Sequence, residues 1–539
     1  MQAPTGIHEE ITMTDIDKKE EIETLEHYHN QEDSGIDYRP EYTTWSLFTT
    51  IRKFWRSIFF CGLVALGATF DGYAITIPGS IIAQAAFIKQ FGTIVNATTG
   101  ALELDALHVS AWSACQNGAQ IFGMLTGPAI SDRFGRKAVM WILSLGLILA
   151  TVLALVAKEW QVYAVAKFFA GMSTGWIQSG LTVYIAEVAP VRARSAILAA
   201  YSFAFALGQL AGAIGLQIVS THDSYKMIFY SEFILLGSFV PALIFAPETP
   251  TWAARKGDEA KTRSCMRRLY GNVDSYDIDR EYLVLRHIIE EESKERSDVW
   301  WRQYVECFQG VNRRRTIVSF LPLAYQQFVG LSLFFAYTTY FFQLAGYPHP
   351  FEASLIQTCI LLLFLVISFF VLDKVGRRPF LLGGGLIMSA CCFCTGGIAY
   401  MEKLPGGALV FLTCLWTASY AMSVGSIGWA YVADTASPRL RAKTAGMAAA
   451  GTAMFGLIFQ YTVPIMLSAQ QANWGLKIGF FFGPLAALGL VVIYFFVPET
   501  KGRTYPELDE LFEKRIPTRQ FKSYVTEVQK AINDSNHEA

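Results

Sequence analysis

The chain has 539 residues, of which 53% are hydrophobic and 17% charged, so it is too apolar for a water-soluble protein of this length. Its formal net charge of -1, without a basic stripe carrying interleaved aromatic residues, argues against nucleic-acid binding. The sequence contains no nucleophile–base pair, metal-ligand spacing or phosphate-binding glycine loop, and therefore predicts neither an enzyme nor a cofactor or metal site.

The polar and apolar residues are segregated along the chain. Residues 1–57 are polar and acidic, and we expect a disordered cytosolic tail there rather than a signal peptide. Residues 58–250 and 316–499 each hold six apolar segments of about 20 residues, the length that spans a bilayer. A polar linker, residues 251–315, separates these two blocks, and residues 500–539 form a second polar tail.

The apolar segments predict twelve transmembrane helices, because lipid tolerates only backbones that are hydrogen-bonded within helices or closed barrels. Strand-like alternation is absent, so we expect an all-α membrane protein. The helices are predicted to begin near Phe59, Val109, Val139, Val162, Ala196, Met227, Ile317, Leu355, Phe380, Ala408, Ala445 and Ile478.

The short loops on one side of the predicted helices carry most of the loop lysines and arginines. The positive-inside bias therefore places both tails and the linker in the cytosol. The first external loop then contains the sequon Asn96-Ala97-Thr98, which makes Asn96 a candidate glycosylation site.

Three short motifs recur in the two blocks in the same order and at nearly constant offset, which indicates a duplicated six-helix unit with two pseudo-symmetric halves. They are the Asp-x-x-Gly-Arg runs at 132–136 and 373–377, the acid–arginine pairs Glu187/Arg194 and Asp434/Arg441, and the Pro-Glu-Thr triplets at 247–249 and 498–500.

The repeated charges predict a cytosolic gate. Glycine permits a tight turn between two helices, and the arginines can pair with the acids across helices. Such bridges would lock the inner side when it is closed and break when it opens. Alternatively, the arginines only set the topology. The predicted gate comprises Asp132, Arg133, Gly135, Arg136, Glu187, Arg194, Asp373, Gly376, Arg377, Asp434 and Arg441.

Several stretches carry a family resemblance: SDRFGRK, VYIAEVAP, PETPTWAARKG, LAYQQFVGLS, DKVGRRP and VPETKGRTYPELDELFE. Through them the chain, from about residue 59 to 513, resembles the sugar porter family of the major facilitator superfamily. The stretches RRRTIVSF and RLRAKT are most similar to the fungal branch that includes maltose and other alpha-glucoside permeases. The resemblance implies the major facilitator fold, with cytosolic helices in the linker, and a plasma-membrane location.

The chain departs from this family at the usual proton-coupling carboxylate. Proton-coupled members carry an Asp after Gly-Tyr in the first helix, where this chain has Ala74, although Asp71 lies about one turn earlier. Lys167 replaces the usual arginine partner, and Glu232 stands where a glutamine is common. Because charges within a membrane usually face a partner or a water-filled cavity, Asp71 or Glu232, near Lys167, is a candidate displaced proton-coupling site. The alternative is a static ion pair in a passive facilitator.

The resemblance also marks a substrate site. Paired glutamines can donate to and accept from sugar hydroxyls. The candidate residues are Gln209, Gln326, Gln327, Ser332, Tyr337 and Thr452, of which Ser332 and Thr452 replace larger amides of the family. The loss of those amides, and of a tryptophan at Val424, predicts a wider and less polar cavity than a hexose site. Thr452 could instead hold helices together.

The sequence thus predicts a transporter that moves a sugar or sugar-like solute by alternating access, with or without a coupled proton. An exporter of a small secondary metabolite and a non-transporting sugar sensor are the alternatives. The expected partners are a small-molecule solute, for which we expect a sugar, and the lipid bilayer, and the expected state is a monomer.

Overall fold

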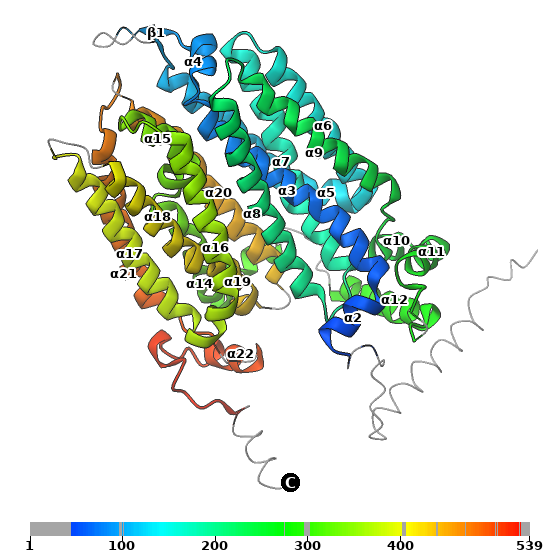
Figure 1. The fold of residues 1–539 in the computed structure, drawn as a ribbon. Helices are drawn as coiled ribbons and strands as arrows, with labels where there is room; N and C mark the ends of the chain where they lie inside the picture. Colours follow the sequence, from blue (N-terminus) through cyan, green and yellow to red (C-terminus); the bar gives the residue numbers. More distant parts are fainter. Residues whose placement is uncertain are drawn as a thin grey trace, which may run out of the picture.

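The computed structural model describes residues 42, 45–95, 100, 102–273, 275–295, 302–401, 406–437, 440–468, 470–501, 503, 505–527 and 529. The chain forms two helical bundles that lie side by side (Figure 1). The first bundle consists of α3 (Trp55–Ile81), α5 (Ala106–Phe134), α6 (Arg136–Val156), α7 (Trp160–Val188), α8 (Arg194–Ser220) and α9 (Lys226–Phe245).

The second bundle repeats this arrangement with two of its helices broken. It consists of α14 (Gly310–Phe328), which continues through the π-helical turn η2 (Ser332–Ala336) into α15 (Thr338–Leu344), then α16 (Pro350–Val375), α17 (Arg377–Ile398), α18 (Gly406–Met422), α19 (Val424–Thr435), α20 (Arg441–Leu467) and α21 (Gly479–Phe496).

Within the described residues, nine helical segments are long and apolar enough to cross a membrane. The helices α5, α7 and α14 pack with these nine segments in the bundles but are more polar. For example, α7 carries Lys167, Gln178 and Glu187. We infer that these three helices complete the twelve predicted spans, with their polar side chains facing other helices rather than lipid.

The remaining elements cap opposite ends of the two bundles. The short α4 (Ala85–Phe91) and the antiparallel strands β1 (Ile94–Val95) and β2 (Leu102–Glu103), in which Ile94 pairs with Glu103, form what we call the hairpin end. At the other end, the linker end, lie α2 (Leu47–Lys53), α10 (Pro250–Arg255), α11 (Glu259–Tyr270), α12 (Ile278–Glu295) and α22 (Tyr505–Glu513), as Figure 1 shows. The short α13 (Arg302–Glu306) precedes α14. Short 3-10 turns, η3 (Gly475–Ile478) and η4 (Thr518–Gln520), complete the fold.

The predicted tight turns are present at Gly135 and Gly376. Gly135 joins α5 to α6 with φ +104°, and Gly376 joins α16 to α17 with φ +111°. Residues with a side chain rarely adopt this backbone conformation, so the sequence needs glycine at both points.

The breaks in the second bundle have local causes. Gly330 has φ +89°, and beyond it the Tyr337 N–H donates to the Ser332 carbonyl at 3.0 Å, a bond that spans five residues instead of four. Ser423 interrupts α18 and α19 with an irregular backbone. Such interruptions are common at functional sites, because they expose backbone groups and allow a helix to bend.

The two bundles are joined by hydrogen bonds near the hairpin end. Asn117 on α5 donates to the side-chain oxygen of Gln460 on α20 at 2.9 Å, and Thr339 on α15 donates to Ser80 on α3 at 2.9 Å. Gly79 on α3 lies against Ala336 of η2, so closely that a Cβ atom there would be 1.6 Å from the Ala336 carbonyl oxygen. The bundles are therefore closed against each other at the hairpin end.

Candidate functional site

Arg136 is the centre of the charged network in the first half. Its side chain is 3% exposed, and the guanidinium donates to both carboxylate oxygens of Glu187 on α7, at 3.0 and 2.6 Å. A further nitrogen lies 3.2 Å from Asp132, at the end of α5. A bidentate arginine–carboxylate contact of this kind fixes the relative position of three helix ends.

Glu248 of the first Pro-Glu-Thr triplet caps the same network. Its carboxylate accepts from the backbone N–H groups of Arg136, at 3.0 Å, and Lys137, at 3.1 Å, at the start of α6. A carboxylate at a helix N-terminus satisfies unpaired N–H groups and interacts favourably with the helix dipole. The sequence shows the repeated triplet, but nothing in its spacing indicates that its glutamate caps α6.

The second half repeats this geometry. Glu499 accepts from the backbone N–H groups of Arg377 and Arg378 at the start of α17, each at 3.1 Å. The Arg377 guanidinium lies 3.0 Å from Asp434 on α19. Each half thus has an arginine, a partner acid on another helix, and a glutamate that caps the arginine's own helix.

The remaining predicted gate residues do not all join these networks. Arg133 and Arg194 are exposed, and the Arg133 guanidinium lies over the Phe134 ring. The structure shows Glu187 bound to Arg136 rather than to Arg194. The side chains of Asp373 and Arg441 lie outside the described part of the chain.

Both arginine–acid pairs join helices of one half. Neither pair links one half directly to the other, and the opening and closing of these bridges stays a prediction. Both pairs hold the helix ends of a half together as a unit.

The three predicted intramembrane charges separate into two groups. Lys167 on α7 and Glu232 on α9 are 6% and 8% exposed, and their opposite charges influence one another, although the two described groups form no salt bridge within 4.0 Å. Glu232 accepts from the Thr151 hydroxyl at 2.7 Å, and the Lys167 ammonium lies 4.9 Å from the centre of the Tyr163 ring. This group spans α6, α7 and α9.

Asp71 belongs to a different cluster. It is 1% exposed and accepts from the Gln178 amide of α7 at 3.1 Å, while Gln120 of α5 donates to Gln178 at 3.0 Å. The other Asp71 oxygen and the nearby Tyr201 hydroxyl have no hydrogen-bond partner within the described residues. The sequence offers Asp71 and Glu232 as candidate neighbours of Lys167. In the structure, Glu232 is the carboxylate near Lys167.

The paired glutamines lie at the end of α14, just before its break. Gln326 accepts from the Tyr420 hydroxyl of α18 at 3.1 Å, and Tyr420 is stacked on Trp416 with ring centres 5.4 Å apart. The sequence does not reveal the role of Tyr420. Val424 stands where the family often has a tryptophan, and Tyr420, about one helical turn earlier, supplies an aromatic ring in this region. No motif singles out a lone tyrosine in an apolar helix.

Gln327 and Ser332 carry unsatisfied buried oxygens. Within the described residues, neither the Gln327 Oε1 nor the Ser332 Oγ has a hydrogen-bond partner. Gly456 on α20 adjoins this region, since a Cβ atom there would lie 3.3 Å from the Gln327 Nε2. Because buried polar groups are nearly always hydrogen-bonded, these oxygens are suited to accept or exchange hydrogen bonds with a solute.

The other predicted substrate residues have different surroundings. The Tyr337 hydroxyl donates to the Gln460 carbonyl at 2.9 Å and contacts Ser113, which places it in the closure at the hairpin end. The Thr452 hydroxyl donates to the Ala448 carbonyl of its own helix at 2.8 Å. Gln209 is 4% exposed on α8, with its backbone beside Gly72 of α3. Asn96 lies outside the described residues.

The two-bundle fold agrees with comparisons to known proteins. A family model described as "Sugar (and other) transporter" matches residues 60–512. The chain belongs to this sugar transporter family. The predicted family is therefore confirmed, and with it a multi-pass membrane transporter rather than an enzyme.

Two curated relatives illustrate the similarity. The chain is 28% identical over 533 residues to the general alpha-glucoside permease of Saccharomyces cerevisiae (strain ATCC 204508 / S288c). This match covers 95% of this chain and 84% of the relative. It is 27% identical over 486 residues to the major facilitator-type transporter ecdD of Aspergillus rugulosus, covering 86% and 88%.

A solved structure supports the major facilitator fold independently. The xylose transporter XylE from E. coli, in an inward-open conformation, matches with a TM-score of 0.68 and 20% sequence identity, covering 84% of this chain and 99% of that chain. The predicted fold of two pseudo-symmetric six-helix halves is thereby confirmed.

Proposed function

We propose that this transporter carries an alpha-glucoside, such as maltose, across the plasma membrane into the cytosol. The observation that carries the proposal is the match to an alpha-glucoside permease along 95% of the chain. The maltose permease MAL31 of the same yeast strain is also 28% identical, over 496 residues. These relatives favour a sugar over the metabolite and sensor alternatives.

The arrangement around Gln326 and Gln327 is compatible with such a solute. The Gln327 Oε1 and the Ser332 Oγ are buried and unpaired, so a sugar hydroxyl that donates to them relieves an unfavourable desolvation. The Tyr420 ring, held beside Gln326 by its hydroxyl, offers a partly exposed aromatic surface for a sugar ring. Gly456 lets α20 lie close to Gln327, since a Cβ atom at this position would be only 3.3 Å from the Gln327 Nε2.

The closure at the hairpin end suggests how access alternates. With the linker end in the cytosol, as the charge bias of the loops predicts, the described conformation is closed to the outside. Opening outward requires the contacts between Gly79 and Ala336, and between Asn117 and Gln460, to separate. The networks of Arg136 and Arg377 keep each half rigid during this movement, which is the two-state behaviour that alternating access needs.

We further propose that Glu232 and Lys167 couple a proton to this movement. A buried carboxylate and a buried ammonium that interact across α7 and α9 respond to small changes in helix position. Protonation of Glu232 would remove a negative charge near Lys167 and change the packing of these helices. Asp71, which lies in the Gln178 cluster, is the second candidate carrier of a proton.

Uptake in yeast that lacks its own maltose permeases tests the proposed function. Cells producing the wild-type protein should accumulate labelled maltose and make the external medium more alkaline. The Glu232→Gln variant should lose accumulation against a gradient but keep equilibration of the sugar. Absence of uptake of any tested glucoside, by protein shown to be at the cell surface, would contradict the proposal.

A further inference from the structure

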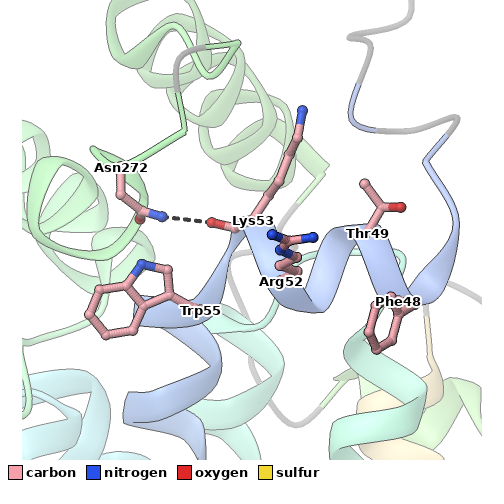
Figure 2. Close-up of a pocket in the computed structure, with 6 residues that line it drawn as sticks. All are labelled: Phe48, Thr49, Arg52, Lys53, Trp55 and Asn272. Atoms are coloured by element: carbon pink, nitrogen blue, oxygen red, sulfur yellow. Dashed lines mark hydrogen bonds between the residues drawn. The ribbon is translucent and has the colours of Figure 1, made fainter.

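A cavity of about 500 Å³ lies at the linker end, where α2 leads into α3 (Figure 2). It is lined by Phe48, Thr49, Arg52, Lys53, Trp55 and Asn272. Asn272, between α11 and α12, donates from its amide to the Lys53 carbonyl at 2.6 Å, as the dashed line in Figure 2 shows. The cavity therefore joins the entrance of the first membrane span to the linker helices.

The cavity is built for an anion. Two cationic side chains line it, and no carboxylate does so among the described residues. Within the same residues, the structure shows no acidic partner for Arg52, and the Lys53 ammonium lies 3.8 Å above the Trp45 ring. Two adjacent cations that have no counter-charge among the described residues create a local positive potential that attracts a phosphate.

A polar acceptor is also left over in this cavity. The Asn272 Oδ1 is buried and has no hydrogen-bond partner within the described part of the chain. Since an unpaired buried acceptor is unfavourable, the cavity suits a ligand that carries a hydrogen-bond donor as well as a negative charge.

The surroundings place this ligand in a lipid layer. Phe48, Trp55 and Phe59 are 77%, 55% and 53% exposed, on the segment that enters the span of α3. Aromatic side chains of this kind lie at the membrane interface, with basic residues at the level of the lipid headgroups. A ligand phosphate held by Arg52 therefore lies at the depth of the headgroups, with apolar surface below it for acyl chains.

We propose that this cavity binds the headgroup of an anionic phospholipid that also carries a donor, such as phosphatidylserine. Arg52 and Lys53 bind the phosphate, and the serine ammonium donates to the Asn272 Oδ1. The bound lipid connects α2 to the linker helices of the first half. This proposal concerns a lipid site and holds whichever solute is transported.

Native mass spectrometry of the full-length protein, released from phosphatidylcholine nanodiscs with increasing phosphatidylserine, tests the proposal. The wild-type protein should retain phosphatidylserine in preference to phosphatidylcholine. The Arg52→Gln/Lys53→Gln double variant should show a loss of apparent affinity of roughly ten- to thirtyfold, since each basic residue near a membrane surface contributes measurably. The Arg52→Lys variant, which keeps the charge, should retain most of the binding.

The matched control is the Lys256→Gln/Lys522→Gln variant, which removes two exposed cations outside the cavity and should bind phosphatidylserine like the wild type. Soluble glycerophosphoserine, which lacks the acyl chains, should compete weakly. Equal retention of phosphatidylserine by the wild type and the Arg52/Lys53 double variant would overturn the proposed site. If glycerophosphoserine competes with the same affinity as the lipid, the ligand is a soluble phosphate compound and the proposed lipid ligand is wrong.

Discussion

The Gly79→Ala substitution should shift this transporter away from the conformation closed at the hairpin end. The new methyl group would lie 1.6 Å from the Ala336 carbonyl oxygen, whereas Cβ atoms essentially never come within 3.0 Å of another heavy atom. The obstacle is backbone and cannot rotate away. Forced overpacking costs about 1–3 kcal/mol, which corresponds to a shift of roughly 5–150-fold in the ratio of two conformations.

Chemical labelling of a cysteine introduced at Ser113 measures this shift. Ser113 contacts Tyr337 in the closure, so a membrane-impermeant maleimide added outside the cell should reach it only when the hairpin end opens. Gly79→Ala should raise the labelling rate within the range given above. Cys265 should not compete, because it lies on α11 at the linker end, opposite the side to which the reagent is added.

Two glycines of the same helix provide controls. Gly62 has no heavy atom within 4 Å of a Cβ position, so Gly62→Ala should leave the labelling rate unchanged. Gly72 meets the Phe205 carbonyl within its own half, and Gly72→Ala should lower stability without favouring the outward-open form. If Gly79→Ala labels at the wild-type rate, the closure at the hairpin end does not depend on this contact and the reasoning is wrong.

Three further predictions follow from the site. Glu248→Ala leaves two N–H groups of α6 unpaired and should destabilise the protein by about 1–3 kcal/mol, seen as a lower melting temperature in detergent, whereas an unchanged temperature would remove the capping role. Gln327→Ala should raise the KM for maltose about tenfold or more. Thr452→Val should change the KM little, because the Thr452 hydroxyl bonds to its own helix. Equal effects of the two substitutions would contradict the role of Gln327 in binding the sugar. Lys167→Met should abolish sugar-driven alkalinisation, and a normal proton signal in this variant would exclude its role in coupling.

The sequence predicts much of the architecture, because short local motifs recur in both halves. The Asp-x-x-Gly-Arg turns depend on glycine at fixed positions, and both adopt the expected positive φ. The repeated spacing marks Glu187 and Asp434 in the sequence, but only the structure shows that these acids bind Arg136 and Arg377. What the spacing does not show is how a triplet more than 100 residues away folds back, so the capping role of Glu248 emerges only from the structure.

The intramembrane charges show a second limit. A sequence places Asp71 and Glu232 in helices but does not give the rotation of one helix against another. The structure puts Glu232 beside Lys167 and Asp71 beside Gln178, a separation that depends on long-range packing. For the same reason the amide pair Asn117 and Gln460, which joins the two halves, had no sequence signal.

Transport by the purified protein in proteoliposomes tests the central claim most directly. With an inward proton gradient, vesicles that contain the wild-type protein should accumulate labelled maltose above the external concentration. Vesicles with the Gln326→Ala/Gln327→Ala variant should show little uptake at the same maltose concentration. Equal uptake by both proteins would contradict the assigned sugar site, and no uptake of maltose or any other glucoside by correctly folded wild-type protein would contradict alpha-glucoside transport itself.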